Sequence, residues 1–258
     1  MVSKLHAIFF IYARTCRGIR VFIPVLMMRF AIGVGIAVQL AACAIGESPG
    51  AFRNSQLPMY GGIDRQTNDE RRAADDKLIA ELIQRYGGSD AAGSALFERG
   101  DRDFLAGDYA LAMKSFNQAW LLDPNNPDPY WGFAMVYDDQ GKSCAAKTMI
   151  DRALSLNLSS PAGLADAGRI YTYCAVSDTA LSASDKRLLF EQAEEFYSRA
   201  VSMAPRDPNL FGSWAIAHYW QGNYADAWKM IKMQRALGGA PGMDFLNLLQ
   251  AKMTEPRR

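Results

Sequence analysis

Small residues recur in this chain at a fixed spacing of 34 positions. Gly107 is followed by Gly141 at that distance, and three alanine pairs repeat it: Ala112 and Ala146, Ala119 and Ala153, and Ala193 and Ala227. A constant period of this length is typical of stacked helix–turn–helix units, in which small residues let neighbouring helices approach closely. The spacing therefore predicts an all-α array of short helix pairs.

The charges of the 258 residues nearly balance, with 28 Lys and Arg against 27 Asp and Glu. Their distribution is uneven, because residues 1–42 hold five basic residues and no acidic one. The rest of the chain keeps 23 basic against 27 acidic residues. This mildly acidic balance lacks the basic footprint of a nucleic-acid-binding protein, so we expect no nucleic-acid partner.

The N-terminal segment predicts export. Residues 30–44 are uncharged and mostly apolar, Arg29 precedes them, and the tetrapeptide Leu40-Ala41-Ala42-Cys43 lies near their end. The apolar stretch is shorter than the roughly 20 residues of a membrane-spanning helix. We therefore predict that residues 1–42 are a removed export signal. Met27 or Met28 is an alternative start, which would give the signal an ordinary length.

The same tetrapeptide resembles the bacterial lipobox. That resemblance implies cleavage before Cys43, attachment of diacylglycerol to its thiol, and acylation of the new amino terminus, with palmitate for example. Ala44, in place of an aspartate, implies an outer-membrane anchor facing the periplasm. Several acyl chains at one residue hold a protein firmly at a bilayer, whereas one chain binds only marginally. Plain cleavage or an uncleaved anchor is the alternative.

Two segments precede the repeats. Residues 43–66 are rich in Gly and Pro and show no helical period, which predicts a tether. Its apolar stretch 57–62 indicates either a linker that contacts the body or a docking motif. Residues 67–90 predict an N-terminal capping helix, because Thr67-Asn68-Asp69-Glu70 suits a helix start and Gly87-Gly88 a helix end.

The region 91–241 resembles the tetratricopeptide repeat (TPR) family in four units. The matching residues are Gly100, Gly107, Asp108, Tyr109, Ala112, Phe116, Ala119 and Pro124 in the first unit; Tyr130, Ala134, Tyr137, Gly141, Ala146, Ile150 and Ala153 in the second; Gly168, Tyr171, Ala193, Tyr197, Ala200 and Pro205 in the third; and Phe211, Ala215, Gly222, Asn223, Tyr224, Ala227 and Ile231 in the fourth. The resemblance implies an α-α superhelical solenoid of about four helix pairs, A and B. Residues 242–258 would form a C-terminal capping helix and tail.

The pattern departs from the family at three places. Leu158 stands where a proline is typical, and Gln234 stands where helix B should have an alanine. The third unit carries 13 extra residues between its helices, around Cys174 to Lys186. Ser182-Ala183-Ser184-Asp185 resembles a capping box and predicts the start of helix B there. The insertion either extends helix A or projects as a contact.

Cys144 and Cys174 would be the only thiols of the mature body, because Cys16 and Cys43 lie in the export segment and at the lipid site. In a TPR stack, the end of one helix A lies beside the start of the preceding helix B. The resemblance therefore implies that Cys144 and Cys174 are neighbours, and an oxidising periplasm favours a disulfide between them. The alternative is two buried thiols that act as small apolar side chains.

No combination of residues predicts catalysis. The mature chain has one histidine, His218, in an aromatic segment where packing is the more common role. Asp138 and Asp139 are adjacent, and on a helix adjacent side chains diverge. Motifs typical of metalloproteases and of phosphate-binding loops are absent from the sequence. We expect no enzyme, no catalytic residue, no cofactor and no metal site.

The TPR resemblance implies instead a groove lined by the A helices, which would bind a peptide or helix of another protein. Residues that correspond to groove positions are Phe97, Asp101, Phe104, Trp131, Met135, Asp138, Asp139, Arg169, Tyr173, Asn209, Ile216, Tyr219 and Trp220. The alternative is that some rings only fill contacts between neighbouring A helices. The carboxylate clamp of chaperone-binding TPR proteins is missing, because Phe97 and Asp101 occupy the first-repeat positions.

These observations predict a non-enzymatic outer-membrane lipoprotein that serves as an interaction scaffold or assembly factor in the periplasm. Two alternatives stay open. One is a regulator or activator subunit of a cell-wall hydrolase that uses the carboxylates near Asp138. The other is an immunity protein against a periplasmic toxin.

Overall fold

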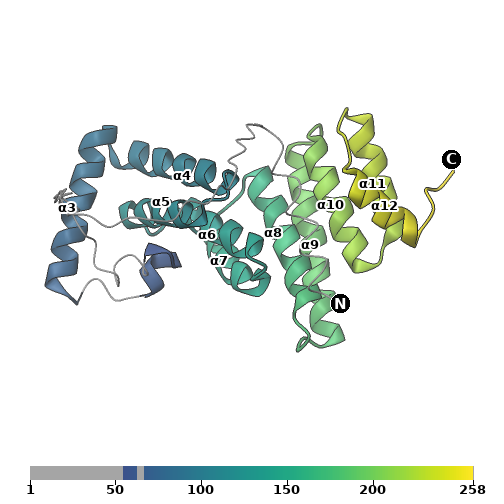
Figure 1. The fold of residues 1–258 in the computed structure, drawn as a ribbon, viewed down its shortest axis with the longest axis horizontal. Coiled ribbons are helices and arrows are strands. Elements are labelled where there is room, and N and C mark those ends of the chain that lie inside the picture. The colour runs from purple at the N-terminus through teal and green to yellow at the C-terminus, as the bar shows by residue number, and fades with distance from the viewer. Residues whose placement is uncertain (1–54, 63–66, 258) are drawn as a thin grey trace, which may run out of the picture. The chain divides into compact units, whose positions relative to one another are not determined.

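A computed structural model describes residues 55–62 and 67–257 (Figure 1). No described residue lies in a strand. The helices are η2 (Pro58–Gly62), α3 (Asp69–Tyr86), α4 (Ser89–Leu105), α5 (Tyr109–Leu122), α6 (Pro127–Asp139), α7 (Ser143–Ser155), α8 (Pro161–Ser177), α9 (Ala183–Met203), α10 (Pro208–Gln221), α11 (Tyr224–Ala236) and α12 (Met243–Lys252). The predicted export signal and the predicted lipid site at Cys43 lie outside the described residues.

Consecutive helices pack as pairs, and this confirms the predicted fold class. The pairs are α4 with α5, α6 with α7, α8 with α9, and α10 with α11, and we call their first and second members A and B helices. Figure 1 shows α3 beside the first pair and α12 beside the last. Since α3 packs on α4 and α5, and α12 packs on α11, both ends of the series have a capping helix.

Glycines allow the helices of the first pairs to approach closely. A Cβ atom added at Gly100 on α4 would lie 2.5 Å from the Phe116 ring, and one added at Gly132 on α6 would lie 2.6 Å from the same ring. Gly168 on α8 has the same relation to Tyr197 on α9, also at 2.6 Å. The predicted contacts of Gly100 and Gly168 are thus confirmed, and Gly132 adds a second one that the repeat pattern does not indicate.

The turns of three pairs use glycine as predicted. Gly107, Gly141 and Gly222 have φ angles of 79°, 74° and 82°, in the left-handed region that glycine adopts at least cost. After α7, where TPR units typically have a proline, the chain turns at Asn157 and Leu158 instead. Asn157 takes a φ of 68°, and Leu158 is buried while its N–H donates to the Ala153 carbonyl over 3.0 Å.

The insertion in the third unit lengthens both of its helices. α8 has 17 residues and α9 has 21, whereas the helices of the second unit have 13 each. The predicted capping box is present: the Asp185 N–H donates to Ser182 Oγ over 3.1 Å, and the Ser182 N–H donates to Asp185 Oδ2 over 3.3 Å. The extension of helix A is therefore confirmed, and helix B is lengthened as well, by more residues than helix A.

Gln234 replaces the expected small residue because two glycines make room for it. Its side-chain Nε2 would lie 2.6 Å from a Cβ atom at Gly212 on α10, and its Cγ would lie 2.8 Å from one at Gly239. The departure in helix B is thus compensated in the paired helix A and in the segment after α11.

Residues 55–62 contact the array at α5, as the linker interpretation predicts. The fully buried Asn117 side chain donates from Nδ2 to the carbonyls of Ser55 and Leu57, both over 2.9 Å, and accepts from the Tyr60 N–H over 3.2 Å. Met59 packs against the core cluster whose buried residues come from the segment α5 to α9. One asparagine therefore fixes the backbone of this segment, since all three bonds are made to main-chain groups.

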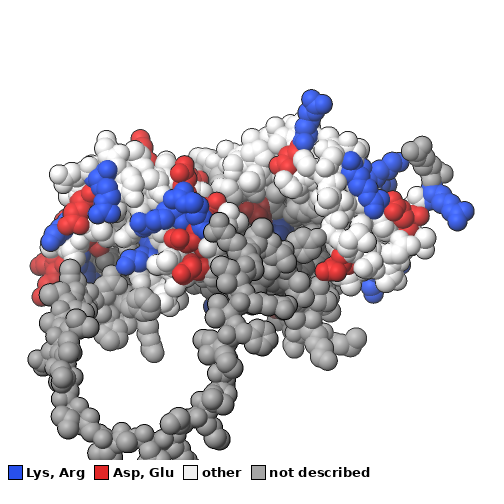
Figure 2. All heavy atoms as spheres, turned by 45° about the horizontal axis from the view of Figure 1, so that its top comes forward, with Lys and Arg blue, Asp and Glu red and all other residues white. Residues whose placement is uncertain are grey.

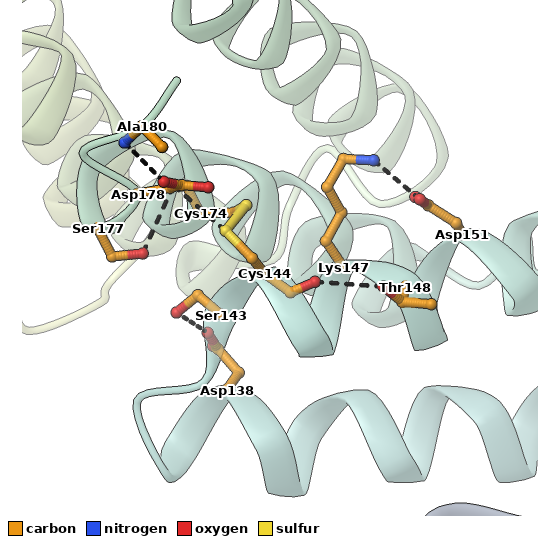
Figure 3. Close-up of a disulfide and its surroundings, with 10 residues drawn as sticks. All are labelled: Asp138, Ser143, Cys144, Lys147, Thr148, Asp151, Cys174, Ser177, Asp178 and Ala180. Atoms are coloured by element: carbon orange, nitrogen blue, oxygen red, sulfur yellow. Dashed lines mark hydrogen bonds and ion pairs between the residues drawn. A yellow bond between two sulfur atoms is a disulfide. The ribbon is translucent and has the colours of Figure 1, made fainter. Parts of the chain in front are cut away.

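A disulfide joins the second unit to the third (Figure 3). Cys144 lies in the first turn of α7 and Cys174 in the last turn of α8, and their Sγ atoms are 2.03 Å apart. Beside the bridge, the Lys147 ammonium pairs with Asp151 over 2.8 Å. The predicted pairing of these cysteines is present in the structure.

Charged side chains are mixed on the surface. Figure 2 shows Lys and Arg interspersed with Asp and Glu on the face drawn, without a large area of one sign. Among the described residues, no helix combines the length and apolar character that crossing a membrane requires.

Candidate binding surface

The A helices form one layer, because α4 contacts α6, α6 contacts α8, and α8 contacts α10. All thirteen predicted groove residues lie on these four helices. We call the side of the layer that carries them the A-helix face. Asp139 and Asn209 are exposed there, and most of the other side chains are partly buried.

Aromatic rings on this face contact one another between neighbouring helices. The Phe97 ring on α4 and the Trp131 ring on α6 have centroids 5.4 Å apart, and those of Tyr173 on α8 and Trp220 on α10 are 6.3 Å apart. Tyr219 packs instead against Tyr224 and Phe245, at 5.7 Å from each. Phe97, Trp131, Tyr173 and Trp220 thus link A helices and keep partly exposed surfaces. Tyr219 contacts Trp220 on its own helix and, beyond α10, the last two helices.

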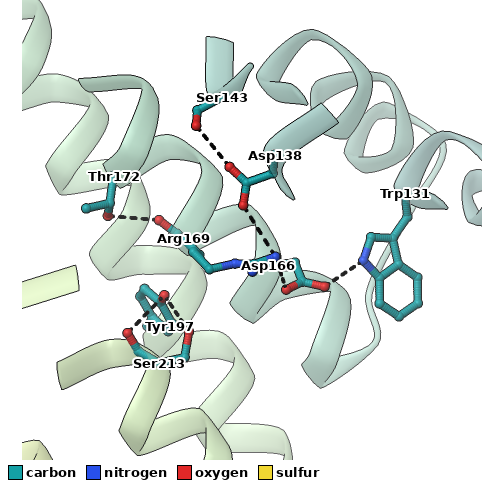
Figure 4. A network of polar contacts seen from close by, with 9 residues as sticks. Trp131, Asp138, Ser143, Asp166, Arg169, Thr172, Tyr197 and Ser213 are labelled. Carbon is teal, nitrogen blue, oxygen red and sulfur yellow. Dashed lines mark hydrogen bonds and ion pairs between the residues drawn. The ribbon is translucent and has the colours of Figure 1, made fainter. Parts of the chain in front are cut away.

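Four polar side chains connect the second and third A helices (Figure 4). Arg169 Nη2 lies 2.8 Å from Asp166 Oδ1 and 3.5 Å from Asp138 Oδ2. The Trp131 indole N–H donates to the other oxygen of Asp166 over 2.8 Å. Asp138 also accepts from the Ser143 hydroxyl over 3.0 Å. Arg169 therefore joins two carboxylates, and Asp166 joins the guanidinium to the aromatic ring.

Burial and charge act in opposite directions on these groups. Burial raises the pKa of Asp138, and this outweighs the lowering by Arg169 and by the Ser143 hydrogen bond. Burial lowers the pKa of Arg169, but the charges of Asp166 and Asp138 raise this pKa by more than burial lowers it. The guanidinium therefore stays protonated. Burial and then the charge of Asp166 raise the pKa of Asp101. Arg102 lowers the pKa of Asp101 in turn, so burial is the main reason why the pKa values of both carboxyls are raised.

The tetratricopeptide repeat family model matches residues 103–165, from the end of α4 to the first turn of α8. Residues 103–165 carry tetratricopeptide repeats. None of the curated proteins matches it. TPR units generally bind protein partners and are not catalytic, so an interaction surface is the property that this family brings to the chain.

Two of the TPR positions expected to line an open groove are buried. Met135 is 6% exposed and belongs to the core cluster formed by α5 to α9, and Asp138 is 7% exposed. The alternative that some groove positions fill contacts between neighbouring helices therefore describes these two side chains. The repeat pattern locates the A-helix face. It does not show that Arg169 of the neighbouring helix α8 pairs with Asp138 on α6.

Asp138 and its neighbour Asp139 point to different partners. Asp138 interacts with Ser143 and Arg169, whereas the exposed Asp139 accepts from the Tyr109 hydroxyl. The adjacent carboxylates therefore diverge, as the helical geometry predicts. They do not form the convergent pair that general acid–base catalysis requires.

Asp166 is a central residue of the TPR face that the family pattern does not single out. It contacts Arg169 and Trp131, and its side chain is 24% exposed. Its position one helical turn before Arg169 is the sequence signal for it, because residues three apart on a helix share a face. The sequence alone could have predicted the pair of Asp166 with Arg169. The bond of Asp166 to Trp131 joins two different repeats, and the sequence gives no signal for it.

His218 has a packing environment. Its ring stacks on Trp214 with centroids 5.6 Å apart, and its Nδ1 lies 3.4 Å from Glu194 Oε1. Burial lowers the pKa of His218, and the charge of Glu194 opposes this. Within residues 55–62 and 67–257, no group of three His, Cys, Asp or Glu side chains is arranged to hold a metal ion.

Proposed function

We propose that this protein is a lipid-anchored scaffold of the bacterial cell envelope, whose TPR array binds a segment of another protein on its A-helix face. The observation that carries this proposal is the pair of ring contacts Phe97–Trp131 and Tyr173–Trp220, whose partly exposed rings lie on all four A helices. Large rings with some exposed area are the side chains that most often dominate binding energy at protein interfaces.

The charges of the A helices indicate the chemistry of the partner. The four A helices carry eight Asp or Glu residues, three Arg and no Lys. The B helices carry six acidic against nine basic residues. A partner segment with Lys or Arg side chains next to apolar ones complements this acidic, aromatic layer, since opposite charges favour encounter and orientation.

The centre of the A-helix face is suited to one such cation. Phe97 and Asp101 lie one helical turn apart on α4, and the Phe97 ring contacts Trp131, which donates to Asp166. Arg169 is already shared between two carboxylates, and Asp101 adds a further carboxyl group that Asp166 and Arg102 influence in opposite directions. A guanidinium or ammonium placed over these rings would gain about 0.5–2 kcal/mol from the cation–π interaction, besides its ion pairs.

The anchor places this surface near a bilayer. The lipobox-like tetrapeptide that ends at Cys43 supports lipidation, and the contacts of Ser55 with Asn117 support a firmly held tether end. Ser55 follows Cys43 by 12 positions, and a chain of that length spans at most about 40 Å when extended. Confinement to that distance from the membrane raises the local concentration of a membrane-associated partner.

The anchor has a direct test. Cells that express the protein should incorporate radiolabelled palmitate into the wild type and not into the Cys43→Ser variant, because only a thiol receives the diacylglycerol. The variant should also stay unprocessed by the lipoprotein signal peptidase. Equal labelling of both proteins would rule out Cys43 as the lipid site.

The binding function is tested by crosslinking in intact cells, followed by affinity purification. Wild-type protein should recover a partner protein, and the double variant Trp131→Ala/Trp220→Ala should recover at least about tenfold less, as expected when two interface rings are removed. Tyr219 is not chosen, because its contacts with Tyr224 and Phe245 give it a structural role.

The matched control removes large side chains from the B helices. Leu111 and Leu188 are 50% and 54% exposed on α5 and α9, so Leu111→Ala/Leu188→Ala should leave recovery unchanged. Circular dichroism of both double variants checks that the helices are retained. Equal recovery by the two variants would reject the A-helix face as the binding surface.

A wall-hydrolase function receives no support from the diverging carboxylates Asp138 and Asp139.

A further inference from the structure

A pocket of about 420 Å³ lies where α7, α8 and α9 meet. None of the thirteen predicted groove residues lines it. Its apolar wall is formed by Leu154, Leu158 and Phe196, and Asn157, Ser159 and Arg199 provide polar groups. The volume is within the range of small-ligand sites, which are mostly apolar with a few polar groups that orient the ligand.

Arg199 supplies the uncompensated charge of this pocket. Its guanidinium has no hydrogen-bond or ion-pair partner among the described residues. The carboxylate in the lining, Asp151, is already satisfied, because it accepts from the Tyr171 hydroxyl over 2.5 Å and pairs with Lys147 over 2.8 Å. The Lys147–Asp151 pair is neutral overall, so the pocket keeps the positive charge of Arg199 for a ligand.

The polar groups beside Arg199 are also available. The side chains of Asn157 and Ser159 make no hydrogen bond with the part of the chain that the structure describes. Asn157 is held in the left-handed conformation, and the following N–H of Leu158 is bonded to Ala153. Two of the lining rings support each other, because Phe196 and Tyr171 make an edge-to-face contact with centroids 5.1 Å apart.

We propose that this pocket binds a carboxylate that bears a short apolar group, as the last residue of a polypeptide does. Arg199 pairs with the carboxylate, since a guanidinium and a carboxylate form strong, directional hydrogen bonds. Leu154, Leu158 and Phe196 receive the apolar side chain. Asn157 and Ser159 bond the amide that precedes the carboxylate. The site is independent of the A-helix face and would add a second contact to any partner bound there.

Ligand-observed NMR on the full-length protein tests this with small probes. N-acetyl-leucine should bind with a Kd on the order of 1 mM, which is what a ligand of this size reaches. N-acetyl-leucinamide, which lacks the carboxylate, should bind at least about tenfold more weakly, because the charged hydrogen bonds are lost. A pentapeptide that ends in leucine shows whether the natural ligand is the end of a polypeptide or a small acid. If the pentapeptide binds as tightly as N-acetyl-leucine or more tightly, the ligand is a polypeptide end. If only N-acetyl-leucine binds, the ligand is a small molecule.

Variants at two exposed arginines complete the experiment. Arg199→Gln should weaken binding of N-acetyl-leucine by about tenfold or more, and Arg199→Lys should retain part of it. Arg206→Gln, an exposed arginine outside the pocket, should bind as the wild type does. The proposal is overturned if neither acid binds, if the amide binds as well as the acid, or if the two glutamine variants behave alike.

Discussion

Replacing Phe116 with alanine is expected to lower the free energy of unfolding by about 3–5 kcal/mol, the range measured for fully buried phenylalanines. The ring is 0% exposed and lies between Gly100 and Gly132, which belong to two successive A helices. Its removal would leave a cavity that rigid helix backbones on both sides cannot close. Guanidinium denaturation followed by circular dichroism at 222 nm measures the change.

Leu111 provides the control for this experiment on the same helix. Its side chain is 50% exposed, so Leu111→Ala should change the free energy of unfolding by less than about 1 kcal/mol. A similar small loss in both variants would contradict the structure, because it would mean that Phe116 does not connect the first two pairs. A glycine-to-alanine change at Gly132 would push a methyl group into the same ring.

Loss of the disulfide is expected to have the second largest effect. The double variant Cys144→Ala/Cys174→Ala should be less stable than the oxidised protein by about 3–4 kcal/mol, because the bridge closes a loop of about 30 residues in the unfolded chain. The sequence separation of the two cysteines is 30. Unfolding curves of the oxidised, the reduced and the double-alanine proteins give the three values.

Reduction separates the effect of the bridge from that of the side chains. A reducing agent should shift the unfolding midpoint of the wild type toward that of the double variant and leave the variant unchanged. Titration of the unfolded, oxidised protein should find neither Cys144 nor Cys174 reactive. A wild-type midpoint that does not respond to reduction would show that the bridge is not formed.

The repeat period predicts much of this fold because small residues in phase report helix contacts directly. Gly100 and Gly168 were expected to receive helix B, and both do so against Phe116 and Tyr197. The capping box at Ser182 marks the start of α9 equally well, since it depends only on residues close in sequence. Local signals of this kind need no knowledge of the tertiary structure.

Contacts between distant segments are less accessible from the sequence. Nothing around Asn117 indicates that its side chain bonds the backbone of residues 55–60, because the partners are more than 50 positions away. The compensation of Gln234 by Gly212 is of the same kind. Met135 was expected on an open face, but burial at the edge of a face depends on the neighbouring helix, which periodicity does not describe.

The central claim is that a partner protein binds the A-helix face, and site-specific photocrosslinking in intact cells tests it most directly. The photoreactive residue p-benzoylphenylalanine replaces Phe97 or Trp220 on the A helices, or Leu111 or Leu188 on the B helices. In each variant, one large side chain is replaced by another large side chain. Adducts with one partner protein at Phe97 and Trp220, and none at Leu111 and Leu188, are the predicted result. Adducts that form only from the B helices would contradict the account.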